Sequence, residues 1–232
     1  LNLYTNTPAV LTEIVSNAWD ADATEVYIDV DTENSTITIA DNGHGMNADD
    51  VERKFLNVGY ARRDDNRKKS PSGRNVMGRK GIGKLAMFSL DEVSVFTKTE
   101  NDEVVALKVD VPDLKQAIKE KRQYETETIT DTSSFTKSHG TTIILAKLGR
   151  EIKTTATYLK KHLARRFSIL GANFDFRVFV NKEEITLEHR EYTSKIEFLW
   201  SLGDTAKHLK NNNTNNYLRA QKFFLLLAVV YY

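Results

Sequence analysis

Glu13 and Asn17 stand four residues apart in the run EIVSNAWDAD at residues 13–22. In a helix this spacing places both side chains on one face. The Glu13 carboxylate could take a proton from a water molecule, and the Asn17 amide oxygen could bind a hard cation such as Mg²⁺. A polar helix face is also ordinary on a soluble protein, so the choice between chemistry and solvation depends on the other motifs.

Asp41 belongs to a second motif, DNGHGM at residues 41–46, which follows an expected strand. Its carboxylate can accept a hydrogen bond from an exocyclic amine. Gly43 and Gly45 have no side chains, so a flat ring can approach the main chain closely, and Met46 offers that ring a soft apolar surface. This motif favours a site for a base that carries an amino group.

A third motif, GRKGIGK at residues 78–84, is typical of a glycine-rich turn that opens a helix. Gly81 and Gly83 leave backbone N–H groups free to bind phosphates, and Lys84 adds positive charge. Each motif is common alone. Together they predict a site for a nucleotide and its Mg²⁺, in which Glu13 activates a water that attacks the terminal phosphate.

The spacing of apolar residues predicts the elements that position these motifs. Steps of three and four residues predict a helix over 8–20, and alternation predicts strands over 25–31 and 36–40. Residues 61–75 are polar and basic without periodicity, and we expect them to form a mobile loop. Further strands are expected at 93–98, 104–111, 141–147 and 174–180, and helices at 49–56, capped by Asn47, and at 154–167.

Composition sets limits on function. A net charge of +1 over 232 residues argues neither for a general polyanion binder nor for an acidic tail, and the absence of cysteine excludes disulfides and thiolate nucleophiles. The longest apolar run, at residues 223–232, has about half the length of a membrane-spanning helix. We therefore expect a cytoplasmic protein without a membrane anchor. The chain begins at Leu1 and ends inside this apolar run, so we also expect it to be a piece of a longer protein.

In this order, the motifs resemble the GHKL superfamily of ATPases, which groups gyrase, a heat-shock chaperone, histidine kinases and MutL. The run from residue 13 to 46 is especially similar to MutL and MORC proteins, and residues 78–98 look more like the chaperone's second glycine motif. The resemblance covers about 8–147. It implies a Bergerat fold, an α/β (α+β) two-layer sandwich with a mixed, mostly antiparallel sheet and helices on one face.

The resemblance also implies a domain organisation. It places the ATP-binding domain at 1–150, with a flexible lid at about 61–84. Residues 151–232 would continue it or begin a transducer-like region.

Matched residue by residue, the resemblance makes Glu13 the general base, Asn17 the magnesium ligand and Asp41 the residue that reads adenine. Thr141, in GTTIIL at 140–145, would hydrogen-bond the adenine region, or Thr142 if the alignment shifts by one. The full set of positions expected to line the nucleotide is Asn17, Asp20, Ala21, Asp41, Gly43, Gly45, Met46, Gly78, Gly81, Ile82, Gly83, Lys84 and Thr141.

Two positions depart from the pattern of the family. Asp22 stands where MutL-like sequences often carry glycine, and Lys84 replaces an aromatic or small residue. The distant lysine that a following domain usually directs at the terminal phosphate is not identified in residues 1–232.

The resemblance implies Mg²⁺-dependent ATP hydrolysis, with lid closure and dimerisation through the lid or the N-terminus driving change in attached domains or a protein partner. A link to DNA or to defence systems follows by analogy only. Two alternatives remain: a histidine-kinase-type domain that transfers phosphate to a protein, and a nucleotide sensor without turnover. The continuation NAWDADAT favours the hydrolytic branch, and Glu13 argues against a pure sensor.

Overall fold

The computed structural model describes residues 7–56, 69–77, 90–146, 155–171 and 174–191. Within them, eight strands form one sheet in the order β5-β4-β3-β6-β2-β1-β7-β8, with β1 and β7 parallel and the other neighbours antiparallel. The strands are β1 (Glu25–Asp31), β2 (Thr36–Asp41), β3 (Glu92–Lys98), β4 (Val105–Asp110), β5 (Glu127–Thr128), β6 (Gly140–Ala146), β7 (Arg177–Val180) and β8 (Glu183–Glu184). The expected mixed, mostly antiparallel sheet is confirmed.

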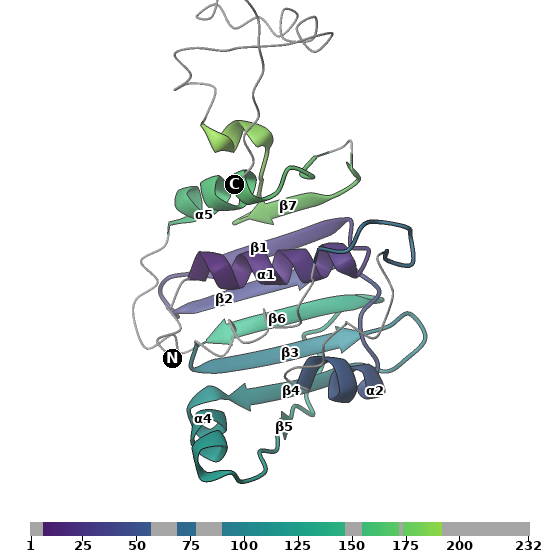
Figure 1. Ribbon diagram of the computed structural model, residues 1–232, viewed down its shortest axis with the longest axis vertical. Helices are drawn as coiled ribbons and strands as arrows, with labels where there is room; N and C mark the ends of the chain where they lie inside the picture. The colour runs from purple at the N-terminus through teal and green to yellow at the C-terminus, as the bar shows by residue number, and fades with distance from the viewer. Residues whose placement is uncertain (1–6, 57–68, 78–89, 147–154, 172–173, 192–232) are drawn as a thin grey trace, which may run out of the picture. The chain divides into compact units, whose positions relative to one another are not determined.

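Helix α1 (Thr7–Asp20) lies over β1 and β2 (Figure 1). Its apolar residues recur every three or four positions and are buried against the sheet, which is the pattern of an amphipathic helix on a core. Helix α5 (Ala156–Arg166) packs beside α1 and buries Leu159 and Leu163 in the same core. The two helices therefore cover one face of the sheet, while Tyr27 and Asp29 of β1 are exposed on the other.

The strand register sets the position of the candidate site. Asp41, at the end of β2, pairs with Thr141 of β6, and Thr141 pairs in turn with Thr97 of β3. Directly paired residues on neighbouring strands point to the same face of a sheet. The three side chains therefore form a row on the helix-covered face, in line with the buried Ile39 and Ile143.

Most expected elements are confirmed, and the differences have local causes. Asn47 caps α2 (Ala48–Asp50) by accepting from Asp50 N at 2.9 Å, but the chain then continues as a π-helical turn, η1 (Val51–Leu56). The strand expected at 174–180 begins only at Arg177, because Asp175 adopts a left-handed turn with φ of 48°.

Helix α4 (Val111–Glu120) was not expected from the sequence. Asp110 ends β4 and at once caps this helix, accepting from Asp113 N at 2.9 Å, with Pro112 in the first turn. Lys121 ends the helix in a left-handed conformation with φ of 55°. The expected strand at 104–111 therefore ends at Asp110, and its last residue belongs to the helix.

The compact unit extends past residue 150. Strand β7 pairs with β1, strand β8 pairs with β7, and η3 (Leu187–Arg190) follows them. The first unit of the chain runs to His189 and the second covers Arg190–Tyr232. The assignment of residues 151–232 to a transducer-like region stays a prediction.

Candidate functional site

The turn at Asp41 meets the end of α1. The Asp41 side chain is buried, and its Oδ1 accepts the Gly43 N–H at 2.8 Å. A side chain at Gly43 would bring Cβ within 2.8 Å of the Ala21 carbonyl oxygen, and His44 N donates to that same oxygen at 2.9 Å. The structure thus brings together residues from two separate motifs: Ala21 at the end of α1, and Asp41 and Gly43 at the end of β2.

Asn42 and Gly45 fix the conformation of this turn. Asn42 Oδ1 accepts from the backbone N–H groups of Thr24 and Glu25, both at 2.9 Å, and its Nδ2 donates to Thr24 Oγ1 at 2.8 Å. Gly45 has φ of 68°, and a Cβ there would lie 1.9 Å from the Lys98 carbonyl oxygen. Only glycine fits at this approach, so the motif is held against β1 on one side and β3 on the other.

Thr97 connects the turn to β6 and was missed by the sequence interpretation. Its side chain is fully buried, and its Oγ1 accepts from Met46 N at 2.9 Å. The same oxygen lies 3.1 Å from Thr141 Oγ1 and 3.2 Å from the Gly140 carbonyl oxygen. No local motif surrounds Thr97, and only the register of β3 against β6 could have identified it.

The register also separates the two candidate threonines. Thr141 pairs with Asp41 on the helix-covered face, whereas Thr142 pairs with Ala40 one position along the strand. Alternate residues of a strand point to opposite faces, so Thr142 points away from the Asp41 side chain. The geometry favours Thr141 as the residue beside Asp41.

Lys137 and His139 hold the Asp41 turn from the loop before β6, and the sequence interpretation missed both. Lys137 Nζ donates to the Asp41 carbonyl oxygen at 2.7 Å, and His139 Nδ1 lies 2.8 Å from the Gly43 carbonyl oxygen. Gly140 follows with φ of 120°, and a Cβ there would lie 2.3 Å from the Asp41 carbonyl oxygen. Burial lowers the pKa of Lys137, although the nearby Asp41 charge opposes that change.

The electrostatics of Asp41 depend on this packing. Burial raises its pKa above the ordinary 3.8, because water no longer solvates the charged carboxylate. The backbone N–H groups of Gly43 and Thr141 and the Lys137 charge offset part of this rise. The Asp41 side chain is thus kept dry and in a fixed orientation, which suits one strong hydrogen bond to a ligand.

Glu13 and Asn17 lie half-buried on α1, one turn apart as expected. Within the described ranges, the Asn17 side chain makes no hydrogen bond, so its amide oxygen can bind a ligand. One neutral oxygen fits a Mg²⁺ ion that keeps most of its waters and also contacts phosphate. Across the described ranges, no group of three or more His, Cys, Asp or Glu side chains gathers as a ligand cluster.

Asp20 links α1 to the segment before the third motif. Its side chain is buried, and Oδ1 accepts the Met77 N–H at 2.7 Å. The predicted phosphate-side residues Gly78, Gly81, Ile82, Gly83 and Lys84 lie outside the described residues. Of the expected lid at 61–84, residues 69–77 are described. They make defined contacts, which include a bridge between Lys69 and Asn75 and hydrogen bonds from Arg74 to Ser70 and Ala23, and the mobile lid stays a prediction.

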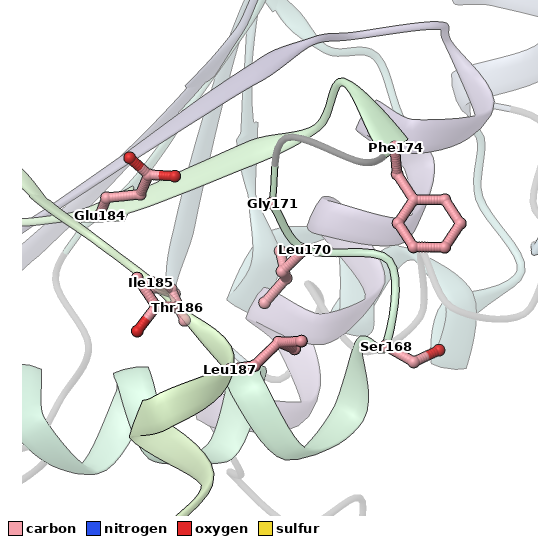
Figure 2. Close-up of a pocket in the computed structure, with 8 residues that line it drawn as sticks. All are labelled: Ser168, Leu170, Gly171, Phe174, Glu184, Ile185, Thr186 and Leu187. Atoms are coloured by element: carbon pink, nitrogen blue, oxygen red, sulfur yellow. The ribbon is translucent and has the colours of Figure 1, made fainter. Parts of the chain in front are cut away.

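A separate hollow of about 240 Å³ lies between the segments that flank β7 and β8 (Figure 2). Leu170 and Leu187 extend toward its middle, while the Glu184 carboxylate points away. None of its lining residues belongs to the predicted site, so its position gives no support for nucleotide binding there. They are Ser168, Leu170, Gly171, Phe174, Glu184, Ile185, Thr186 and Leu187.

Comparison with known proteins decides the family. The model of the "Histidine kinase-, DNA gyrase B-, and HSP90-like ATPase" family matches residues 4–141, more than half of the chain. The chain belongs to this ATPase family. The matched range contains α1, the Asp41 turn and the first residues of β6, and membership supports ATP binding by this GHKL domain.

Curated relatives agree with that assignment. A protein of Herpetosiphon aurantiacus named "Putative type II restriction enzyme HgiDII" is 34% identical over 209 residues, which cover 90% of the GHKL chain and 34% of the relative. The DNA mismatch repair protein MutL of Exiguobacterium sibiricum is 28% identical over 66% of the chain and 22% of its own length.

The chaperone protein HtpG of Clostridium acetobutylicum is 30% identical over 44% of the chain and 20% of its own length. The GHKL chain thus spans about a third or less of each of these three relatives. Within the described residues, no helix combines the length and the apolar composition needed to cross a membrane.

Proposed function

We propose that this GHKL domain binds Mg²⁺·ATP, reads its adenine with Asp41 and hydrolyses its terminal phosphate. The observation that carries the proposal is the buried Asp41 carboxylate, fixed by the Gly43 N–H and paired with Thr141. Such a group accepts a hydrogen bond from the adenine amino group. It rejects the carbonyl oxygen that guanine presents at the same position, because two acceptors would then face each other.

The residues around Asp41 suit a planar base. Gly43 and Gly45 let the turn pack against protein main chain, because the space that a Cβ would take is filled by the carbonyl oxygens of Ala21 and Lys98, and so they hold the turn and open no space for a ring. Met46 is half-buried beside them and offers the base an apolar surface. Thr141 has a hydroxyl that can bond the base directly or through water. Ala21, at the end of α1, contacts this turn, and Ala21 and the preceding Asp20 would line the adjoining part of the nucleotide.

The phosphate chemistry is assigned to α1 and to the third motif. Asn17 would hold Mg²⁺, which supplies positive charge to the phosphate oxygens. Gly78, Gly81, Ile82, Gly83 and Lys84 would contact the phosphates. Glu13 would orient a water and take its proton as the water oxygen bonds to the terminal phosphorus. The bond from that phosphorus to the bridging oxygen then breaks, and ADP and phosphate leave.

The same proposal includes closure of a lid over the nucleotide and dimerisation of two chains, with the energy used by attached domains or a partner. One aligned relative is named a DNA mismatch repair protein, and another is named a restriction enzyme. These names support a DNA-linked process for the whole protein, of which this chain would be the ATP-dependent part. Stimulation of turnover by added duplex DNA would support that link.

Competition binding with ATP and GTP, at fixed Mg²⁺, tests the central step of the proposal. We expect ATP to displace a fluorescent ADP analogue at concentrations at least about tenfold lower than GTP does. The carbonyl oxygen of guanine cannot donate to Asp41, so GTP binding loses at least one hydrogen bond to a charged group. Equal displacement by the two nucleotides would remove Asp41 from the role of base reader.

A further inference from the structure

Asp22 is in a conformation that its residue type disfavours. It follows the last turn of α1 with φ of 59°, in the left-handed region where glycine is the usual residue. An aspartate at such a position costs free energy unless its side chain makes compensating contacts. The contacts of Asp22 reach across the sequence to the segment at residues 69–77.

The Asp22 carboxylate accepts three hydrogen bonds from this segment. Oδ1 accepts from Ser70 Oγ at 2.5 Å and from Ser72 Oγ, and Oδ2 accepts the Ser72 N–H at 3.0 Å. Burial alone would raise the pKa of Asp22, but the hydrogen bonds from Ser70 and Ser72 outweigh it and the pKa is lowered. The carboxylate is therefore held in its charged form by these contacts.

Arg74 also binds this segment to the end of α1 and to the residues before β7. Its guanidinium lies over the Trp19 ring, 4.5 Å from the ring centroid, and donates to the Ala23 carbonyl oxygen at 2.5 Å. It also donates to the Asp175 carbonyl oxygen at 3.1 Å, ahead of β7. Trp19 Nε1 donates to the Asn75 carbonyl oxygen at 2.9 Å.

The segment at residues 69–77 ends next to Asp20 of the candidate site. Met77 is the last described residue of the segment, and its N–H donates to Asp20 at 2.7 Å. Asp20 is two residues before Asp22, so both ends of segment 69–77 are bound to the same turn at the end of α1. The glycine-rich motif follows Met77 directly in the sequence.

We propose that Asp22 is a positioning residue, which anchors segment 69–77 to the end of α1 and so fixes Met77 beside Asp20 for nucleotide binding. This inference rests on the proposed function, because the anchor affects activity only if the nucleotide binds beside Asp20 and Met77. It assigns a role to a residue at which the chain departs from its MutL-like relatives.

Substitution of Asp22 by glycine separates anchoring from a structural role. Asp22→Gly relieves the left-handed backbone, which offsets part of the stability lost with the three hydrogen bonds, so the midpoint of thermal unfolding should fall only slightly. Loss of the carboxylate should speed hydrogen exchange of the amides in segment 69–77 and raise the KM for ATP, each by about tenfold or more. Asp22→Asn, which tolerates φ above zero and keeps one acceptor oxygen, should give intermediate values.

Lys121→Gly is the matched control, because Lys121 has φ of 55° and caps α4 at an exposed position outside the site. It should leave the exchange of segment 69–77 and the KM unchanged. Unchanged exchange in Asp22→Gly would overturn the anchor, and faster exchange with an unchanged KM would overturn its positioning role. Absence of ATP binding by the parent protein would refute the proposed function instead, and the exchange result would then decide the anchor alone.

Discussion

Replacement of Asp41 by asparagine should lower the affinity for ATP without lowering the thermal stability of the domain. The substitution keeps the size of the side chain and an oxygen that can accept the Gly43 N–H, which lies 2.8 Å away in the parent. It removes the negative charge from a side chain that is 7% exposed. Nucleotide binding therefore loses a charged acceptor, while the unliganded protein loses a buried charge.

The expected loss of affinity follows from the hydrogen bond. A hydrogen bond to a charged group contributes about 1.5–3 kcal/mol. At about 1.4 kcal/mol for each factor of ten, Asp41→Asn should weaken ATP binding by about 10- to 150-fold. The preference for ATP over GTP should narrow as well, because an asparagine side chain carries both a donor and an acceptor.

The expected effect on stability follows from the raised pKa. Folding favours the protonated form of Asp41, so its contribution to stability is fully present below the ordinary pKa of 3.8 and is lost as the pH rises through the raised folded pKa. At neutral pH the variant should melt at the same temperature as the parent or higher. The part of the pH dependence that comes from Asp41 should also disappear.

Isothermal titration with ATP and thermal unfolding at several pH values measure both effects. Asp29→Asn is the matched control, since Asp29 is an exposed aspartate on the neighbouring strand β1, and it should change neither quantity. Unaltered ATP affinity in Asp41→Asn would refute the role of Asp41. A fall in affinity together with a clear loss of thermal stability would show that the turn had collapsed and that the reasoning about the buried charge is wrong.

Two further substitutions test the support of the Asp41 turn. Lys137→Met removes a positive charge that lowers the pKa of Asp41, so the acid limb of a plot of ATP affinity against pH should move to higher pH; an unmoved limb would contradict this coupling. Gly140→Ala should lower the unfolding midpoint more than Gly171→Ala. Both positions have positive φ, but of the two only residue 140 would place its Cβ against another atom, 2.3 Å from the Asp41 carbonyl oxygen. Equal falls in the unfolding midpoint would show that the Asp41 turn can move to accept the Cβ without a loss of stability.

Periodicity and local motifs were enough to predict the elements that carry the site. Helix α1 and strands β1 and β2 follow from apolar spacing that matches their burial, and Asn47 follows from its position as a cap. Helix α4 could have been predicted from Asp110 and Pro112 at its start, a cap followed by proline in the first turn. The apolar run of β4 obscured that signal because the strand continues directly into the helix.

The contacts that hold the site could not be predicted in the same way. Thr97, Lys137 and His139 reach the Asp41 turn over separations of 51 to 96 residues, and their types alone indicate nothing about those partners. The anchor at Asp22 likewise joins residues that are 48 and 50 positions apart. The sequence did mark Asp22 as a departure from MutL-like relatives, but only the fold places Ser70 and Ser72 beside it.

Phosphate release from Mg²⁺·ATP, measured per protomer over a wide range of protein concentration, tests the central claim most directly. The account predicts turnover that rises with protein concentration as dimers form, and a loss of about 10²–10⁴-fold in Glu13→Ala, the usual effect of removing a positioned base. Glu33→Ala, an exposed glutamate in the turn between β1 and β2, should behave as the parent. Turnover in Glu13→Ala equal to that of the parent, or none in the parent at any concentration, would contradict the account.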